Sequence, residues 1–336
     1  MLKRFSDADV DPQVLSQLTI SVLGYGNQGS AQAQNLRDSG VRVIIGAREK
    51  GLSAQRAMED GFEVVSFEEA ARQSDIIHFL LPDEVHREVY LSIEKHLTSE
   101  KSLCFSHGLN IHFKTIIPPE SVDVFMVSPK GPGVSVRDQY IRGSGLPALI
   151  AVHQNPSGKA LSLALAIAHA NGFTRSLCLE TTFRDETETD LFGEQNVLCG
   201  GASYLVKAGF DVLVEAGYPP EIAYFECVHE LKLIADLIHT DGIAGMSNKI
   251  STTALFGQIV QGERLIDQHV RDSMREQLQR IQSGEFAHQW IDQEYGENQC
   301  ATIRDWLKEC QSWEVEEVGS KIRDAMDFTE KNPERK

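Results

Sequence analysis

Residues 19–40 read TISVLGYGNQGSAQAQNLRDSG, and this stretch decides the fold of the first half of the chain. A β-branched run, Thr19–Leu23, precedes the G-x-G-x-x-G pattern Gly24–Gly29, and a helical pattern at Ala31–Ser39 follows it and ends at Gly40. In a dinucleotide-binding unit the three glycines permit a tight turn, close approach of backbone to a pyrophosphate, and close helix–strand packing. A plain glycine turn would not need this flanking strand and helix, so the context favours nucleotide binding.

The same alternation of strands and helices continues outward from this stretch to about residue 180. Strands are expected at Val41–Ile45, Asp75–Leu81, Ser102–Ser106, Val122–Val127, Leu149–Val152 and Arg175–Leu179. Helical patterns separate several of them, at Phe67–Gln73, Glu84–Leu97 and Gly158–Ala170. This alternation predicts a doubly wound, mostly parallel sheet with helices on both faces. We therefore expect an α/β, Rossmann-type dinucleotide-binding domain over residues 1–181.

The second half of the chain has a different pattern. Strand signals nearly vanish, and apolar residues recur at helical spacing in Leu191–Val214, Glu221–His239, Arg264–Ser283 and Val315–Met326. We predict an all-α C-terminal domain over residues 182–327 and a flexible polar tail at residues 328–336.

The composition limits the classes of partner. The 336 residues carry a formal net charge of −17, with 41% hydrophobic and 24% charged residues, which is typical of a soluble globular protein. The acidic balance argues against nucleic acid as a partner, because phosphate binding needs a basic surface. An anionic substrate would need local cations, either bound metal ions or clustered Arg and Lys.

Cysteine usage and the N-terminal residues indicate the compartment. The six cysteines show no C-x-x-C spacing, so we interpret them as small buried hydrophobic residues in a reducing environment. The polar N-terminal residues lack the apolar region of a signal peptide, and no apolar run is expected to approach the length and hydropathy of a membrane span. These features predict a cytoplasmic protein that binds neither a membrane nor nucleic acid.

The end of the second predicted strand bears on the choice of nicotinamide cofactor. An NAD site usually places an acidic residue there for the ribose 2′-hydroxyl, whereas an NADP site places cations or other donors for the 2′-phosphate. Arg48, Lys50 and Ser53 favour a phosphate, and Glu49 argues the other way. We predict NADPH and leave NADH open.

Carboxylates on two predicted helices indicate a metal site. Glu186, Asp190 and Glu194 recur at intervals of four and so lie along one helix face. A second pair, Glu226 and Glu230, shares its helix face with leucines, and unpaired buried carboxylates cost several kcal/mol or more. Oxygen ligands without a His or Cys cluster suit Mg²⁺, so we predict a binuclear magnesium site. The alternative is a pair of amphipathic helices with solvated acids.

Several motifs together identify a family. Besides the glycine loop they are Leu80–Asp83, Ser106–Asn110, Pro129–Gly133, Glu180–Phe183, Thr187–Gln195, Leu198–Gly201, Ala216–Tyr218, Ala223–Lys232 and Glu316–Gly319. In this order and across nearly the whole chain, they resemble the landmarks of the ketol-acid reductoisomerases, also called acetohydroxy acid isomeroreductases. The chain length is similar to that of the short, class I form.

The resemblance implies a reaction in two steps. A magnesium-dependent alkyl shift rearranges 2-acetolactate or 2-aceto-2-hydroxybutyrate, and a hydride from NAD(P)H then reduces the new 2-keto group to give a 2,3-dihydroxy acid. This reaction belongs to the biosynthesis of valine, isoleucine and leucine. The metal ions are expected to polarise the substrate oxygens as Lewis acids and to template the migration.

The resemblance also implies roles for single residues. Asp190 should bridge two Mg²⁺ ions and Glu194 should bind one of them, while Glu226 and Glu230 attend the other ion directly or through water. Glu230 is also a plausible proton carrier in the reduction.

Further roles implied by the resemblance concern the substrate and the cofactor. Ser251 matches a serine that holds the substrate carboxylate, and His107 and Lys130 match polar residues of the catalytic pocket. The residues expected to bind the cofactor are Gly24, Tyr25, Gly26, Asn27, Gln28, Gly29, Arg48, Lys50, Ser53, Leu81, Pro82, Asp83 and Gly133.

The family implies a homodimer with a shared active site, and a higher oligomer is also compatible with it. Glu226, Glu230 and Ser251 would then come from the partner chain. This chain departs from the usual pattern at Gly51, where a phosphate-binding serine is common, and at Thr252–Thr253, where an asparagine pair is usual. The first departure leaves the cofactor preference open, and the second bears on the shape of the substrate pocket.

Two other functions remain open from the sequence alone. A β-hydroxyacid or 6-phosphogluconate-type dehydrogenase also joins a Rossmann domain to a helical domain, but needs no divalent metal. A non-catalytic nucleotide sensor on the same fold would not need the carboxylates.

Overall fold

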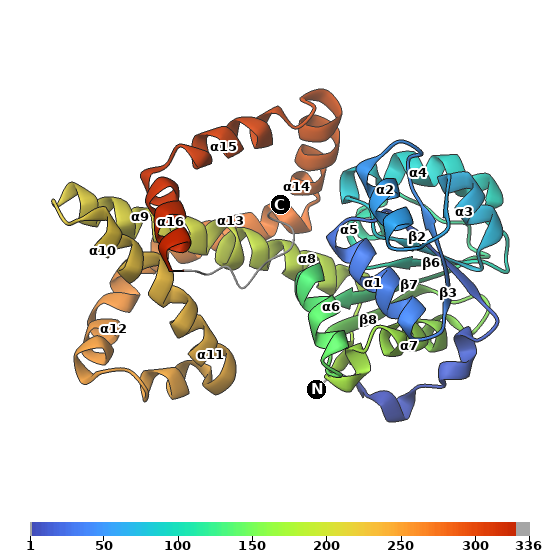
Figure 1. Cartoon of the computed structure of the whole chain (residues 1–336), viewed down its shortest axis with the longest axis horizontal. Helices are drawn as coiled ribbons and strands as arrows, with labels where there is room; N and C mark the ends of the chain where they lie inside the picture. Colours follow the sequence, from blue (N-terminus) through green and yellow to red (C-terminus); the bar gives the residue numbers. More distant parts are fainter. Residues whose placement is uncertain (1, 327–336) are drawn as a thin grey trace. The chain divides into compact units, whose positions relative to one another are not determined.

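The computed structural model describes residues 2–326, so the predicted tail at residues 328–336 lies outside the described residues. By its internal contacts the chain divides into two compact units between Thr189 and Asp190. The first unit contains the β-sheet with its helices, and the described part of the second is helical (Figure 1). The predicted fold class, an α/β Rossmann-type domain followed by an all-α domain, is confirmed.

The sheet of the first unit has nine strands among the described residues, in the order β1-β9-β8-β7-β6-β5-β2-β3-β4. In chain order they are β1 (Arg4–Phe5), β2 (Thr19–Leu23), β3 (Arg42–Gly46), β4 (Val64–Val65), β5 (Ile76–Phe79), β6 (Ser102–Phe105), β7 (Asp123–Pro129), β8 (Ala148–Gln154) and β9 (Cys178–Glu180). All neighbouring pairs are parallel except β7–β8 and β1–β9. The mostly parallel arrangement is the one predicted.

Strand β2 lies at the point where the order of the sheet reverses. It pairs with β3 on one side and with β5 on the other, and both pairs are parallel. Ligands of doubly wound sheets bind outside the carboxyl ends of the strands at this switch point. The loops that follow β2, β5, β6 and β7 therefore meet at one edge, called here the catalytic edge.

Helices cover both faces of the sheet. Those of the first unit are α1 (Asn27–Asp38), α2 (Leu52–Glu59), α3 (Phe67–Gln73), α4 (His86–Ile93), α5 (Leu109–His112), α6 (Gly133–Ile141) and α7 (Ala160–Ala170). Alternate residues of β2 enter two separate buried clusters, Ile20 and Val22 one of them and Leu23 the other. Helix α1 begins at Asn27 and not at the predicted Ala31, because the glycine loop itself forms its first turn.

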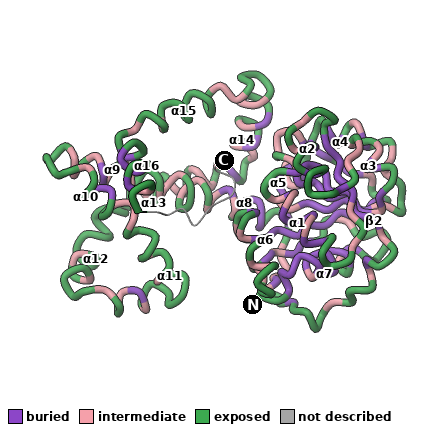
Figure 2. Tube along the Cα trace, in the orientation of Figure 1, coloured by how far each residue is buried: buried purple, intermediate pink, exposed green. Residues whose placement is uncertain are grey.

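The second unit follows α8 (Phe183–Gly193), which crosses the division between the units. Its α-helices are α9 (Gly200–Glu215), α10 (Pro220–Tyr224), α11 (Glu230–Ser247), α12 (Thr252–Leu265), α13 (Gln268–Gln282), α14 (Glu285–His288), α15 (Ala301–Gln311) and α16 (Glu314–Ala325). Wider π-helical turns occupy Glu194–Leu198, Phe225–His229 and Gln289–Glu297. A small core around Phe210, Tyr224 and Val318 joins α9, α10 and α16, while many other residues of the second unit are exposed (Figure 2).

One helical run among the described residues, Phe183–Glu215, is long and apolar enough to cross a membrane by length and composition. Its 18-residue window has a mean hydropathy of 1.5, so the expectation that no apolar run reaches this level is wrong. The run also carries Glu186, Asp190 and Glu194, and carboxylates are costly inside a bilayer. Only 6% of the window is buried within the chain, which leaves an apolar surface for another role.

Candidate active site

The glycine loop after β2 forms a cradle for an anion. Gly24 has a φ of +93°, and a Cβ on Gly29 would lie 2.4 Å from the Gly24 carbonyl oxygen. A Cβ on Gly26 would meet nothing within 4 Å, so this backbone faces open space. Gly26 is the N-cap of α1 and no side chain caps the helix, which leaves the first N–H groups of α1 to a ligand. The loop fits the pyrophosphate of a dinucleotide.

Tyr25 and Gly133, two of the predicted cofactor-binding residues, hold the loop in place by packing. The Tyr25 side chain is buried, and its hydroxyl donates a 2.6 Å hydrogen bond to Asp60; burial raises the pKa of this hydroxyl. A Cβ on Gly133 would lie 2.1 Å from the Asn27 carbonyl oxygen, so only glycine allows α6 to start against the loop. A nucleotide contact of Tyr25 would therefore involve its backbone.

The turn between β3 and α2 carries the predicted 2′-phosphate residues. Arg48, Glu49 and Lys50 are exposed, and Ser53 is half-buried in the first turn of α2. Gly51 is the N-cap of α2 and provides no side-chain cap. Cations and one acid thus share a solvent-facing turn next to an uncapped helix N-terminus, which suits a charged ribose substituent.

The turn after β5 is held by side chains from neighbouring elements. The Asn110 side chain donates to the Asp83 carbonyl at 3.0 Å, and a ring nitrogen of His86 lies 2.9 Å from the Leu81 carbonyl. Leu80 packs against Gly24 so closely that a Cβ there would lie 3.0 Å from the Leu80 carbonyl oxygen. Of the predicted residues in this turn, Leu81 also approaches Gly24, with its Cδ2 3.0 Å from the position of a Cβ there, and Pro82 and Asp83 follow it in the same turn.

A buried carboxylate gathers the predicted catalytic residues. Glu186 of α8 is 1% exposed and lies 2.9 Å from Lys130 Nζ and 3.2 Å from His107 Nδ1. It also accepts hydrogen bonds from the Gly108 backbone N–H at 3.0 Å and from the Ser128 hydroxyl at 2.8 Å. These partners come from the ends of β6 and β7 at the catalytic edge.

Glu186 is ionised in this cluster. Burial acts to raise its pKa, but the hydrogen bonds and charges of His107 and Lys130 outweigh burial and lower the pKa to about 2. A fixed anion there orients both side chains and keeps a cation, Lys130, at the edge of an acidic protein. A Cβ on Gly108 would lie 2.4 Å from Thr187 Oγ1, so α8 packs directly on the strand end that bears His107.

The predicted metal ligands are distributed over α8 and the second unit. Asp190 follows Glu186 by one turn of α8 and is half-buried, and Glu194 opens a π-helical turn and is exposed. Glu226 lies within another π-helical turn and Glu230 follows it directly; both are exposed. Turns of this type occur frequently at functional sites. Carboxylates alone fit Mg²⁺ better than zinc.

Not all of these residues come together in a single chain. Within residues 2–326, no group of three or more potential ligands includes Glu194, Glu226 or Glu230. Ser251 is exposed, and its hydroxyl oxygen caps α12 by accepting from the Ala254 N–H at 3.1 Å.

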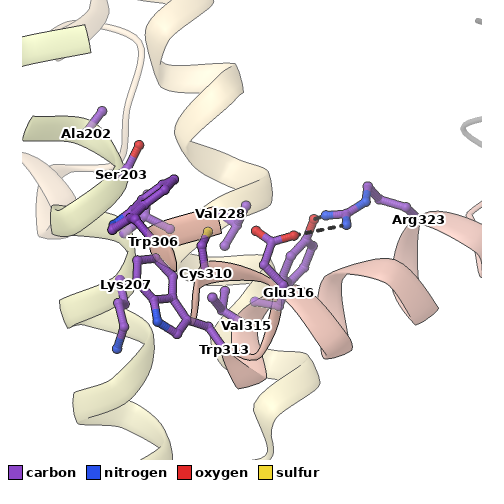
Figure 3. A pocket seen from close by; sticks show the side chains of 12 residues that line it. Ala202, Ser203, Lys207, Val228, Trp306, Cys310, Trp313, Val315, Glu316 and Arg323 are labelled. Atoms are coloured by element: carbon purple, nitrogen blue, oxygen red, sulfur yellow. Dashed lines mark hydrogen bonds and ion pairs between the residues drawn. The ribbon is translucent and has the colours of Figure 1, made fainter. Parts of the chain in front are cut away.

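The second unit also contains a cavity of about 300 Å³, drawn in Figure 3. Trp306 and Trp313 pack edge to face with ring centroids 5.8 Å apart, and Lys207 Nζ lies 5.0 Å from the Trp313 ring. Glu316 and Arg323 form an ion pair at its border. No predicted site residue lines this cavity.

Comparison with known families matches both halves of the chain. The model described as "Acetohydroxy acid isomeroreductase, NADPH-binding domain" matches residues 14–176, and "Ketol-acid reductoisomerase, C-terminal domain" matches residues 183–328. Ketol-acid reductoisomerases (NADP(+)) of Pyrococcus abyssi and Methanopyrus kandleri are each 50% identical to the chain. The alignments cover 96% and 98% of this chain and 97% and 99% of theirs.

Comparison with solved structures agrees. An NADH-preferring ketol-acid reductoisomerase from an uncultured archaeon aligns with a TM-score of 0.93 and 49% identity, covering 96% of this chain and 99% of that one. An NAD-binding semialdehyde dehydrogenase protein of Cupriavidus necator aligns with a TM-score of 0.61 and 20% identity over 79% of this chain and 99% of its own, a likeness of fold only. The chain belongs to the ketol-acid reductoisomerase family.

Proposed function

We propose that this chain rearranges 2-acetolactate or 2-aceto-2-hydroxybutyrate with the help of Mg²⁺ and reduces the product with NADPH to a 2,3-dihydroxy acid. The observation that carries the proposal is the buried, ionised Glu186, which holds His107 and Lys130 at the catalytic edge beside the glycine loop. Family membership favours this reaction over a metal-independent dehydrogenase or a non-catalytic sensor.

Asp190, Glu194, Glu226 and Glu230 would hold two Mg²⁺ ions, which supply Lewis-acid polarisation of the substrate oxygens when bound. The nicotinamide supplies the hydride. Lys130 provides positive charge near the anionic substrate, which a chain of net charge −17 needs.

The side chains have different proposed roles in binding and proton transfer. Ser251 Oγ already accepts from the Ala254 N–H, so its own hydroxyl hydrogen can be donated to the substrate carboxylate. Glu230 carries the proton in the reduction.

For the cofactor we propose NADPH, with NADH also accepted. Arg48 and Lys50 on the exposed turn support the 2′-phosphate, and Glu49 and Gly51 weaken that preference. Relatives named for NADP(+) and one named as NADH-preferring stand at nearly equal identity to this chain, so identity alone does not decide the preference.

We further propose a cytoplasmic homodimer in which each active site takes Glu226, Glu230 and Ser251 from the partner chain. Two observations support it: these three residues are exposed, and α9 to α12 bear exposed apolar side chains such as Leu205, Val212, Leu233, Phe256 and Ile259. An exposed apolar surface of this kind is typical of an obligate interface. All six cysteines are unpaired, in keeping with a reducing compartment.

The test is oxidation of reduced nicotinamide in the presence of racemic 2-acetolactate. NADPH is compared with NADH, and Mg²⁺ with an excess of EDTA. Oxidation that needs both 2-acetolactate and Mg²⁺ is the expected result. A folded dimer that binds NADPH but oxidises none of it would overturn the assigned substrate.

A further inference from the structure

A row of buried polar side chains lies beneath the glycine loop. Gln32 of α1 and His78 of β5 are both fully buried, although neighbours on the same helix and strand, such as Leu36 and Ile77, pack into the apolar core. Burying an amide or an imidazole costs free energy unless each polar atom finds a partner. Their hydrogen-bond partners therefore show what these two buried side chains connect.

Hydrogen bonds connect these residues into one network. The Gln28 side-chain amide donates to the Gly131 carbonyl at 2.9 Å, and Gln32 donates to Gln28 Oε1 at 3.1 Å. Gln32 also donates to the Ser106 hydroxyl at 3.2 Å, and a ring nitrogen of His78 lies 3.2 Å from the same hydroxyl.

The partners determine the direction of every bond. The Gly131 carbonyl can only accept, so Gln28 donates to it and must accept from Gln32. The Ser106 hydroxyl donates to the Val127 carbonyl at 3.0 Å, which leaves its lone pairs for Gln32 and His78. His78 is then the neutral tautomer with hydrogen on Nε2, and burial, which lowers its pKa to about 3, keeps it neutral. The network has a single arrangement.

Three residues of the network are next in sequence to residues that contact Glu186. Gly131 follows Lys130, and Ser106 precedes His107, while Val127 precedes Ser128. Gln28, at the other end, belongs to the glycine loop. Gln32 is the residue that joins the two, because its two N–H groups bond to Gln28 on one side and to Ser106 on the other.

The network is not the arrangement that stability alone would favour. Gln32 Oε1 and His78 Nδ1 are buried without a hydrogen-bond partner among the described residues. An apolar side chain of the same size would avoid this cost. A buried polar network in place of apolar side chains indicates a role beyond packing.

We propose that Gln32 is a positioning residue that fixes the glycine loop relative to the strand ends bearing His107 and Lys130. Gln32 thereby sets the affinity for the dinucleotide and its alignment with the catalytic edge. This inference rests on the proposed function, because it takes the bound molecule to be a nicotinamide dinucleotide.

The test compares Gln32→Met with Gln154→Met in the full-length protein. Gln154 is a matched control, since its amide also donates two hydrogen bonds, to the Pro119 and Val122 carbonyls, but at the opposite edge of the sheet. We expect Gln32→Met to raise Kd and KM for NADPH about tenfold with a smaller fall in kcat, as loss of two hydrogen bonds that order the site would do. Gln154→Met should leave Kd within about twofold of wild type.

The readouts separate positioning from simple loss of stability. Unchanged Kd and KM for NADPH in Gln32→Met, or an equal change in Gln154→Met, would overturn the inference. If Gln32→Met does not fold, Ser106→Ala removes the acceptor with little change in volume and must raise Kd in the same direction. Kd for NADPH is measured without substrate. A wild-type protein that binds NADPH but does not turn over 2-acetolactate would therefore overturn the proposed substrate, and the comparison of Kd between Gln32→Met and Gln154→Met would still test the positioning role.

Discussion

Glu186 organises a site whose parts lie far apart in the sequence. His107 and Lys130 precede it by 79 and 56 residues, and both contact its carboxylate. Because Glu186 is almost fully buried and accepts several hydrogen bonds, its position is fixed by the fold, and it fixes theirs. Removing its charge should therefore affect the chemistry more than the binding of the dinucleotide.

We expect Glu186→Gln to lower kcat about 100-fold or more, the scale of a positioned acid–base group. Kd for NADPH should change little, because the glycine loop is untouched. Steady-state kinetics with 2-acetolactate and a separate NADPH titration check this. Glu188→Gln is the control on the same helix, where the carboxylate pairs with His112 at 3.2 Å. A Glu186→Gln enzyme with wild-type kcat would contradict the assigned role.

His78 makes the first unit sensitive to acid. Burial lowers its pKa from the ordinary 6.5 to about 3, so between these values the unfolded chain binds a proton that the folded chain does not. His78 therefore does not reduce the free energy of unfolding above about pH 6.5. As the pH falls from there toward 3, His78 lowers this free energy by about 1.4 kcal/mol per pH unit.

Replacing His78 by Met should remove this acid sensitivity. Between pH 7 and about pH 5, the free energy of unfolding of wild type should fall by about 2 kcal/mol more than that of His78→Met. Urea unfolding at one protein concentration and both pH values measures the difference. An equal fall in the free energy of unfolding in the two proteins would show that folded His78 binds its proton as readily as unfolded His78 between these pH values.

The turn at residues 47–51 should control the choice between NADPH and NADH. In Arg48→Ala/Lys50→Ala, we expect the ratio of kcat/KM for NADPH to that for NADH to fall about tenfold, because two cations near the 2′-phosphate are lost. Arg42→Ala, an exposed cation at the amino end of β3, is the control and should keep the ratio. An unchanged ratio in the double variant would assign the preference to Ser53 or to the backbone of α2.

The role of Glu186 shows where prediction from sequence stops at the residue scale. Its place in a stripe of carboxylates could be predicted, and His107 and Lys130 could be proposed from the family motifs. That Glu186 binds both could not, because the contact depends on how the ends of β6 and β7 meet α8. The Gln32–Ser106–His78 network was missed for the same reason.

At the element scale, long patterns predicted more than short ones. Thr19–Leu23 and Phe67–Gln73 match β2 and α3 residue for residue, since each has a clear pattern between turn signals. Strands β1 and β4 were missed because two residues show no periodicity. Helices α12 and α15 were missed as well, although apolar residues recur at helical spacing in both, for example Ile303, Trp306 and Leu307 in α15.

The contact between α6 and the glycine loop gives a test at this scale. In Gly133→Ala the new methyl group would lie 2.1 Å from the Asn27 carbonyl oxygen, so backbone must move. We expect a loss of about 1–3 kcal/mol in stability together with weaker NADPH binding. Val134→Ala, an exposed neighbour, is the control for both thermal midpoint and Kd. A Gly133→Ala protein with unchanged NADPH affinity would show that α6 does not support the loop.

At the scale of the whole molecule, the second unit exposes many large apolar side chains within one chain. Its core is small, and α9 to α12 expose large apolar side chains that a free monomer would leave in water. The exposed Glu226, Glu230 and Ser251 lie on or beside these helices. A second copy of the chain would cover the apolar surface and bring these polar groups to a partner's site.

A shared active site makes a quantitative prediction about mixed dimers. Asp190→Asn and Glu230→Gln should each inactivate a homodimer. In a mixed dimer, however, one site would carry both defects and the other neither, if Glu230 acts in the partner's site. Random assembly on co-expression makes half of the dimers mixed, so about a quarter of wild-type activity should return.

Co-expression of Asp190→Asn with Glu194→Gln should restore none, because each site would then retain one defect. If neither pair recovers activity, all the ligands of a site lie on one chain. If both pairs recover activity equally, these residues do not form one shared site.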